Sequence, residues 1–314
     1  MIGELYIIHP AEYKEHPCHL PGYQTISQRF IMNLEKKFCI IGTPVGHSKS
    51  PELYRRIFDE HGFPNYTYTI NEIESEQELA LFLEDMRGGA WDGCNVTMPW
   101  KTLVAEEMDA LLDNAALTNA VNTVVRRCGV LYGDSTDGGG MCDAILSDTG
   151  VGIAGRKVIV LGCGGAARSI IAELALRNAA KISIFCRPGK NKDLTVGLLE
   201  RIDEKMAGKK KLDRSFRPVT TKLCDYDDTI LLLRSISEAD ILINCTPVGM
   251  APHENELPIP DSITFPEDLI VAESIYNPDE TRLIKKARSC NCRTVKGIRM
   301  LELQAQRAAL LYLK

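Results

Sequence analysis

The chain lacks the features that mark several large classes of protein. Its 11 cysteines form no C-x-x-C pair and have no histidines at zinc-ligand spacing, so no metal site is expected. Residues 1–35 hold scattered glutamates and prolines rather than a long apolar stretch, and we interpret them as an extension of unknown purpose, neither a signal peptide nor a membrane helix. Internal repeats and low-complexity tracts are also missing, which excludes a solenoid or fibrous architecture.

Positive charge is in short supply as well. With 37 Lys and Arg against 42 Asp and Glu, the net charge is -5, which gives no electrostatic footprint for nucleic acid or an anionic membrane. We interpret the single basic cluster, residues 209–211, as a solvated turn ahead of a strand. The odd cysteine count and the absence of any sign of an oxidising compartment favour reduced thiols in a cytoplasmic protein.

What the chain does contain is an ordinary globular composition arranged in two α/β series. Its 314 residues, 45% of them hydrophobic, favour two domains, each with its own core. In the first series, short apolar runs alternate with amphipathic segments, and Ser50 before Pro51 is typical of a helix N-cap. The pattern predicts strands at 38–41, 66–70 and 93–97, with helices from 50, 75, 99 and 111.

The second series begins after Gly155. It predicts strands at 157–161, 182–185, 241–244, 269–271 and 293–295, with helices at 166–178, 194–206 and 300–313. Regular alternation of strand and helix is typical of parallel or mostly parallel sheets covered by helices. The fold class expected is therefore α/β.

A glycine-rich turn directly follows the first strand of the second series. Residues 162–167 fit G-x-G-x-x-A and open a helix, with a second strand following. The pattern points to a dinucleotide pyrophosphate bound by Gly162, Gly164, Gly165 and Ala166 at a helix N-terminus. A lone fingerprint also occurs as a purely structural turn, and here the flanking strands favour binding.

The end of the second strand bears on the choice of cofactor. An NAD enzyme usually has Asp or Glu there to bind the ribose 2′-hydroxyl, whereas this chain has Cys186 and Arg187, with lysines just beyond. A guanidinium suits the 2′-phosphate of NADP. NADP is favoured, NAD stays open, and a merely solvated Arg187 is the alternative.

Several segments occur in a fixed order along the chain. They are residues 42–51, 95–101 (NVTMPWK), 120–123 (AVNT), 133–138 (GDSTDG), the glycine turn, 244–250 (NCTPVGM), 276–278 (YNP) and 297–304. Together they resemble the shikimate dehydrogenase family, closest to its quinate/shikimate branch, over about nine-tenths of the chain.

The resemblance implies roles for individual residues. Ser48 and Ser50 would bind the substrate carboxylate, although Ser50 alone reads as an N-cap. The other substrate partners implied are Asn95, Thr97, Asn122, Tyr276 and Gln304. Lys101 and Asp137 match the catalytic pair. Further cofactor contacts are implied at Asp113, Ser274 and Gly297.

The chemistry itself gives Lys101 a task. Interconverting an alcohol and a ketone by hydride transfer needs a group that exchanges the hydroxyl proton. Charged Lys101 can donate that proton as the ketone is reduced, while the reverse reaction needs it neutral. Asp137 would favour the charged form and burial the neutral one.

The resemblance also implies the organisation and the activity. We expect an N-terminal α/β substrate-binding domain with a mostly parallel sheet over 36–136, rejoined by 299–314, and a Rossmann-type dinucleotide-binding domain over 137–298. The active site would lie in the cleft between them, and a homodimer is one of the oligomeric states left open. The reaction implied is reversible NADPH-dependent reduction of 3-dehydroshikimate to shikimate, in aromatic amino acid biosynthesis.

Two alternatives remain at this stage. One is a quinate/shikimate dehydrogenase using NAD or NADP, because quinate shares the carboxylate and vicinal hydroxyls. The other is a dinucleotide-sensing homologue with little turnover, kept open by Arg299, where the family usually has glycine. We expect Arg299 to adopt an ordinary φ and to reach the cofactor, or a carboxylate of the other domain, in a closed state. A solvated Arg299 on a slightly shifted loop is the alternative.

Overall fold

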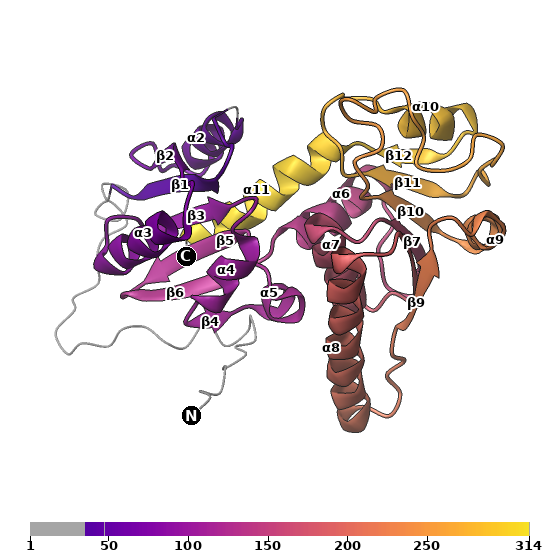
Figure 1. Cartoon of the computed structure of the whole chain (residues 1–314), viewed down its shortest axis with the longest axis horizontal. Coiled ribbons are helices and arrows are strands. Elements are labelled where there is room, and N and C mark those ends of the chain that lie inside the picture. The colour runs from indigo at the N-terminus through magenta and orange to yellow at the C-terminus, as the bar shows by residue number, and fades with distance from the viewer. Residues whose placement is uncertain (1–34, 47, 314) are drawn as a thin grey trace. The chain divides into compact units, whose positions relative to one another are not determined.

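The computed structural model describes residues 35–46 and 48–313, drawn in colour in Figure 1. The predicted N-terminal extension therefore lies outside the described residues, apart from its last position. The chain folds into two compact units. The first runs to Thr136 and regains the chain from Ala305, and the second spans Asp137–Gln304.

The first unit is a six-stranded sheet with helices, in the order β2-β1-β3-β5-β6-β4. Its elements are β1 (Lys37–Gly42), α2 (Ser50–Glu60), β2 (Thr67–Glu72), α3 (Glu76–Gly88), β3 (Gly93–Val96), α4 (Lys101–Glu106), β4 (Ala110–Leu111), α5 (Asp113–Thr118), β5 (Thr123–Arg127) and β6 (Val130–Asp134). Strand β1 pairs in parallel with β2 and β3. The predicted strands and helices up to α5 are present, with their ends shifted by a few residues.

Strand β5 runs antiparallel to both of its neighbours. It is joined to β6 by Cys128 and Gly129, both at positive φ (51° and 84°), which is the backbone of a two-residue hairpin turn. This hairpin was not predicted. Because β5 is reversed, its first residue lies at the edge of the sheet where β1 and β3 end.

The C-terminal end of the last helix, α11 (Gly297–Leu313), supplies part of the core of the first unit. Ala305, Ala308, Ala309 and Tyr312 are buried at the spacing of one helical face. The Tyr312 ring stacks on Phe38 with centroids 4.4 Å apart.

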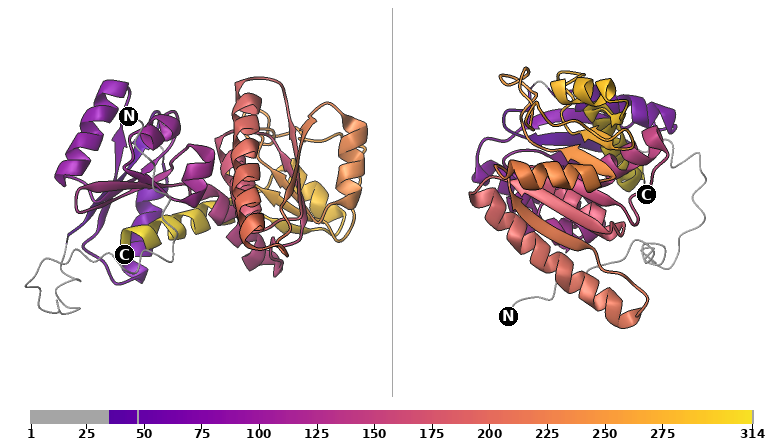
Figure 2. Two further views of the ribbon diagram at one scale, coloured as in Figure 1. Left: turned by 90° about the horizontal axis from the view of Figure 1, so that it is seen from below. Right: turned by 90° about the vertical axis from the view of Figure 1, so that its right-hand side faces the viewer.

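The second unit is an all-parallel sheet in the order β12-β11-β10-β7-β8-β9. Its elements are α6 (Asp137–Thr149), β7 (Lys157–Leu161), α7 (Gly165–Leu176), β8 (Lys181–Cys186), α8 (Lys190–Leu212), β9 (Thr220–Asp225), α9 (Thr229–Glu238), β10 (Ile241–Asn244), β11 (Ile270–Glu273), α10 (Arg282–Ser289) and β12 (Arg293–Val295). Counted along the chain, the strand order is 3-2-1-4-5-6, that of the doubly wound dinucleotide-binding fold. Figure 2 shows α8 and α9 on opposite sides of these strands.

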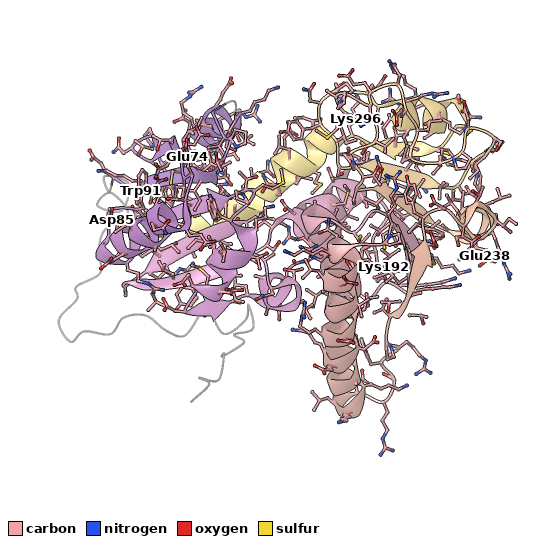
Figure 3. All side chains as sticks on the ribbon, viewed as in Figure 1. Glu74, Asp85, Trp91, Lys192, Glu238 and Lys296 are labelled. Carbon is pink, nitrogen blue, oxygen red and sulfur yellow. The ribbon has the colours of Figure 1, made fainter. Side chains whose placement is uncertain are left out.

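The expected α/β fold class is confirmed, with local corrections. Strand β9 and helices α6, α9 and α10 were not predicted. Helix α8 runs to Leu212, so residues 209–211 form its last turn rather than a loop. Lysines suit that position because the carboxyl end of a helix carries partial negative charge. Figure 3 labels Lys192, in the first turn of α8.

Among the described helices, none combines the length and apolarity that crossing a membrane would require.

Candidate functional site

One edge of the first sheet gathers five of the predicted site residues. Ser48 and Ser50 follow β1, Thr97 and Lys101 follow β3, and Asn122 directly precedes the reversed strand β5. Two backbone hydrogen bonds hold these segments together, from Val96 N to Asn122 O (2.8 Å) and from Val121 N to Lys101 O (2.9 Å). The sheet topology therefore brings these residues together.

The two serines form a hydrogen-bonded pair. Ser48 Oγ donates to Ser50 Oγ at 3.0 Å and accepts from Ser50 N at 3.2 Å. The N-cap of α2 is Lys49, without a side-chain capping bond, and Ser50 is the first helical residue. The predicted N-cap role of Ser50 is therefore wrong, because Ser50 already has helical geometry. Both hydroxyls are half-buried and close enough to bind one carboxylate.

The amide of Asn95 is committed to protein partners. Its Oδ1 accepts from the phenols of Tyr68 (2.7 Å) and Tyr312 (3.1 Å). Its Nδ2 donates to Asn122 O and Thr123 Oγ1, each at 3.1 Å. A direct bond from Asn95 to a substrate would have to replace one of these contacts.

Hydrogen bonds to its carbonyl oxygen orient the side-chain amide of Asn122. Asn122 Oδ1 accepts from Thr136 N at 2.8 Å, from Thr136 Oγ1 at 3.2 Å and from Thr123 Oγ1 at 2.9 Å. Three donors on one oxygen fix which way the amide points. The side chain of Asn122 is thus held at the start of β5.

Lys101 begins α4 on a well-anchored turn. The preceding residue, Trp100, donates its indole N–H to Ile73 O at 2.9 Å, and its backbone N–H bonds Thr97 O at 3.1 Å. Trp100 is buried, while Thr97 and Lys101 are half-buried. The lysine side chain therefore projects from a backbone that the core holds in place.

The second unit contains a pocket of about 350 Å³ where β7, β8 and β10 end. This is the point where the strand order reverses, the usual place for a ligand in a doubly wound sheet. The pocket is lined by Gly162, Cys163, Gly164, residues 186–191, Tyr226 and residues 245–248.

The glycines of the turn after β7 are there for different physical reasons. Gly162 has φ +97°, and a Cβ there would lie 2.9 Å from Cys245 O, so the protein itself requires glycine. A Cβ on Gly164 or Gly165 would meet nothing within 4 Å. This open space lies at the N-terminus of α7, where Ala166 follows Gly165. It would allow a pyrophosphate to approach the backbone closely.

The end of β8 presents an exposed cation to this pocket. The Arg187 guanidinium lies 5.2 Å from the centre of the Tyr226 ring. No Asp or Glu is among the lining residues. Asp225 lies beside Cys186 in the sheet, and its carboxylate accepts from Asp227 N. The sequence did not indicate Tyr226, because its place beside Arg187 depends on the unpredicted strand β9.

The remaining predicted cofactor residues fall in both units. Asp113 starts α5 in the first unit, and Ser274 follows β11 in the second. Gly297 starts α11, where a Cβ would lie 2.1 Å from Ile275 O, so close backbone approach requires this glycine. None of these three residues lines the pocket after β7.

Three predicted residues of the second unit lie on α6, α11 and the loop after β11. Asp137 is the first residue of α6. Gln304 lies against α6, because a Cβ added to Gly140 of that helix would be 2.6 Å from the Cβ of Gln304. The Nε2 of Gln304 donates to Leu301 O. Tyr276 is 48% exposed in the loop after β11.

A buried carboxylate at the end of β11 was missed by the sequence reasoning. Glu273 is 1% exposed. It accepts from Asn244 Nδ2 (3.0 Å), Ile275 N (3.1 Å) and Thr281 Oγ1 (2.9 Å). Burial raises the pKa of Glu273 to about 7 against the opposing effect of these donors. Because Asn244 Oδ1 in turn holds Thr246, Glu273 braces the loop that forms one wall of the pocket.

Arg299 pairs within its own unit. Its guanidinium donates to Asp148 Oδ1 at 3.2 Å and Glu302 Oε2 at 2.5 Å. The residue lies in α11 and is not among the positive-φ residues, so the expected ordinary φ is confirmed. Both carboxylates belong to the second unit. Contact of Arg299 with the cofactor in a closed state stays a prediction.

Comparison with known proteins decides the family. A sequence model described as the shikimate dehydrogenase substrate binding domain matches residues 40–124. The shikimate dehydrogenase (NADP(+)) of Streptococcus suis (strain 05ZYH33) is 36% identical over 269 residues, 86% of this chain and 88% of that protein. The chain belongs to the shikimate dehydrogenase family.

Solved structures of shikimate dehydrogenases have the same fold. The shikimate 5-dehydrogenase of Listeria monocytogenes, in complex with shikimate and NAD, matches with a TM-score of 0.80 and 32% identity, covering 92% of this chain and 94% of its own. A shikimate dehydrogenase in complex with NADP+ matches with a TM-score of 0.74 and 30% identity, covering 88% and 90%. The resemblance stated from sequence motifs is confirmed.

Proposed function

We propose that this chain is an NADP-dependent shikimate dehydrogenase, which reduces 3-dehydroshikimate reversibly to shikimate in aromatic amino acid biosynthesis. The observation that carries the proposal is the serine pair. Two hydroxyls 3.0 Å apart lie at the same sheet edge as Thr97, Lys101 and Asn122, in a chain of this family. This edge offers donors for one carboxylate and further polar groups for ring hydroxyls.

In this proposal Ser48 and Ser50 bind the carboxylate of the substrate. Thr97 and Asn122 bind ring hydroxyls from the first unit, and Tyr276 and Gln304 from the second. An analogue that lacks one of these hydroxyls would lose the hydrogen bond to the matching group, which makes such a site selective. Asn95 supports the site from the core, since its amide already has four protein contacts.

Lys101 carries the proton in this proposal. The ammonium group donates a proton to the ketone oxygen as that oxygen becomes a hydroxyl, and in the reverse direction the neutral amine takes the proton back. Asp137 stabilises the charged lysine. The bound nicotinamide cofactor supplies or accepts the hydride.

The residues present fit NADP. The open glycines 164 and 165 and the N-terminus of α7 suit a pyrophosphate, and the exposed Arg187 suits a 2′-phosphate. The named relative uses NADP(+), although the Listeria structure contains NAD.

We assign the enzyme to the reducing cytoplasm because the ten described cysteines are all free thiols.

An assay of NADPH oxidation with 3-dehydroshikimate tests the proposal. We expect turnover on the order of 1–1000 per second, typical of enzymes, with shikimate as the product identified by mass spectrometry. Lys101→Ala protein, purified in parallel, controls for a contaminating host enzyme. Absence of NADPH-dependent shikimate formation by correctly folded protein would contradict the proposal.

A further inference from the structure

The last residues of two neighbouring strands form a buried polar pair in the second unit. Asn244 ends β10, Glu273 ends β11, and the two residues are partners in the parallel register. They are 0% and 1% exposed. Asn244 Nδ2 donates to both carboxyl oxygens of Glu273, at 3.0 and 3.2 Å. Of the two ends of an amide only the nitrogen can donate, so this contact fixes which way the Asn244 side chain points.

The oriented amide holds the loop that forms one wall of the pocket after β7. Asn244 Oδ1 accepts from Thr246 N at 3.0 Å and from Thr246 Oγ1 at 2.8 Å, and Asn244 Nδ2 donates to Val248 O at 3.3 Å. Thr246 Oγ1 in turn accepts from Val248 N at 3.2 Å. Thr246 and Val248 line the pocket, whereas Asn244 and Glu273 do not. Glu273 therefore acts on the pocket wall through Asn244.

The same carboxyl group holds the segment that follows β11. Glu273 Oε1 accepts from Ile275 N at 3.1 Å. On its carbonyl side Ile275 is packed tightly against the start of α11, since a Cβ on Gly297 would lie 2.1 Å from Ile275 O. The next residue, Tyr276, is one of the proposed substrate partners. The backbone that carries Tyr276 is therefore held by Glu273 and by the close approach at Gly297.

A third segment meets Glu273 at the start of α10. Thr281, the N-cap of that helix, donates from Oγ1 to Glu273 Oε2 at 2.9 Å and accepts from Ile284 N at 3.3 Å. Thr281 also lies against the loop after β10, because a Cβ on Gly249 would be 3.3 Å from the Thr281 Cβ. Donors from three segments thus converge on one side chain. A carboxylate suits this position because it offers two acceptor oxygens.

We propose that Glu273 is a positioning residue for both ligands of the enzyme. Its oxygens orient Asn244, which fixes residues 246–248 against the bound cofactor, and they fix the backbone next to Tyr276 for the substrate. Loss of these oxygens releases both segments at once, so the affinities for NADPH and for shikimate fall together. The rate of the chemical step changes less, because the proposed proton donor, Lys101, belongs to the first unit. This inference rests on the proposed function.

Titration of the purified enzyme with NADPH, followed by NADPH fluorescence, tests the effect on the cofactor. Glu273→Leu keeps most of the side-chain volume but removes both acceptor oxygens. We expect it to raise the Kd for NADPH about 10-fold or more, as for the loss of one hydrogen bond to a charged group. Glu273→Gln should stay within about 3-fold of the wild type, since its amide oxygen can accept from Asn244 and Ile275 while its nitrogen donates to Thr281 Oγ1.

Steady-state oxidation of shikimate with NADP tests the effect on the substrate. Glu273→Leu should raise KM for shikimate by about 3-fold or more at saturating NADP, while kcat falls by less than about 3-fold. A change confined to kcat would overturn the proposal, because a group that positions the ligands acts on their binding.

Leu232→Ala is the matched control for a loss of stability alone. Leu232 is 2% exposed on α9, packs in the same hydrophobic cluster as residues of β10 and β11, and lies outside the pocket lining. The substitution should lower the melting temperature, because it leaves a cavity, yet keep the Kd for NADPH within about 2-fold of the wild type. A loss of NADPH affinity equal to that of Glu273→Leu would overturn the proposal in favour of a general effect of stability.

Thr281→Val is a milder variant that decides the matter if Glu273→Leu does not fold. It removes one of the three groups that hold the Glu273 carboxyl, from a position outside the pocket lining. We expect the Kd for NADPH to rise about 3-fold, and Thr281→Ser, which keeps the hydroxyl, to restore wild-type binding. An unchanged Kd in Thr281→Val, or in folded Glu273→Leu, would overturn the proposal. A wild type that binds no NADPH would contradict the proposed function instead.

Discussion

In the first unit, the polar groups at the edge of the sheet are bonded to one another. Ser48, Ser50, Asn95 and Asn122 all have side-chain hydrogen bonds within the protein. In the second unit the pocket after β7 is open, with unfilled space at Gly164 and Gly165 and an exposed Arg187. The polar side chains of the first unit are held in place by hydrogen bonds to one another. The pocket of the second unit instead has exposed backbone N–H groups, a cation and open space.

The difference follows from what each region has to recognise. A small acid with several hydroxyls is distinguished from analogues by donors and acceptors in fixed positions, which a hydrogen-bonded network supplies. A dinucleotide is long and charged, and it is bound by a helix N-terminus, by glycines that allow close approach and by a cation. Substitutions in the two units should therefore change different kinetic constants.

The largest effect is expected at Lys101. Lys101→Ala should lower kcat by at least about 100-fold with much less change in the substrate KM, as for the loss of a general acid–base group. Lys101→Arg keeps the charge, but a guanidinium does not readily give up a proton at neutral pH, so this variant should be similarly slow. Steady-state kinetics on folded protein measures both. Near-normal kcat in either variant would refute the assignment.

The serine pair should come next. Ser48→Ala combined with Ser50→Ala should lose about 2–4 kcal/mol of kcat/KM for shikimate, roughly 30- to 900-fold, because two bonds to a charged group are removed. The loss should shrink when the methyl ester replaces the acid. A wild-type enzyme that uses the ester as well as the acid would show that the carboxylate is not recognised here.

Glu273 tests whether the second unit also contains an organised polar centre. Its pKa of about 7 exceeds the usual 4.5, so the folded state binds this proton more tightly than the unfolded state does. That stabilisation is complete below about pH 4.5 and is lost as the pH rises through about 7, a loss of up to about 3 kcal/mol.

Glu273→Gln should remove this pH dependence. The free energy of unfolding of the wild type, relative to the variant, should fall between pH 5 and pH 8 in urea titrations. The exposed Glu267→Gln is the matched control and should follow the wild type. Parallel curves for wild type and Glu273→Gln would contradict the raised pKa.

The smallest effect is expected at Arg187. Arg187→Ala should raise KM for NADP(H) by about 10-fold and leave NAD(H) kinetics nearly unchanged, because only NADP carries the 2′-phosphate. Arg217→Ala, an exposed arginine of the same unit outside the pocket lining, is the control. Equal losses with both cofactors would indicate a general effect on the loop.

Local patterns in the sequence were enough to predict much of the fold. The strand, glycine turn and helix at 157–178 are each indicated by a pattern that spans only a few residues. The same is true of α3, whose start is marked by Ser75, and in the structure Ser75 is the N-cap of that helix. The β5–β6 hairpin was missed although Cys128-Gly129 separates two short runs that each contain valine. A two-residue turn ending in glycine was the signal available.

The supporting polar residues could not be predicted in the same way. Tyr68 and Tyr312 meet at Asn95 from positions 27 and 217 residues away, and Glu273 meets Asn244 across 29 residues. Read along the chain, a tyrosine on a strand or near the end of an apolar helix indicates only core packing. Their roles depend on the sheet order and on the return of the C-terminal helix to the first unit.

The most direct test of the account is a steady-state assay that crosses shikimate and quinate with NADP and NAD. The fixed donors of the first unit and the exposed cation of the second predict the highest kcat/KM for shikimate with NADP. Replacing either the acid or the cofactor should lower it by about 10-fold or more. A higher kcat/KM for quinate, or for NAD, would contradict the assignment of the corresponding unit, and no turnover with any pair would contradict the account as a whole.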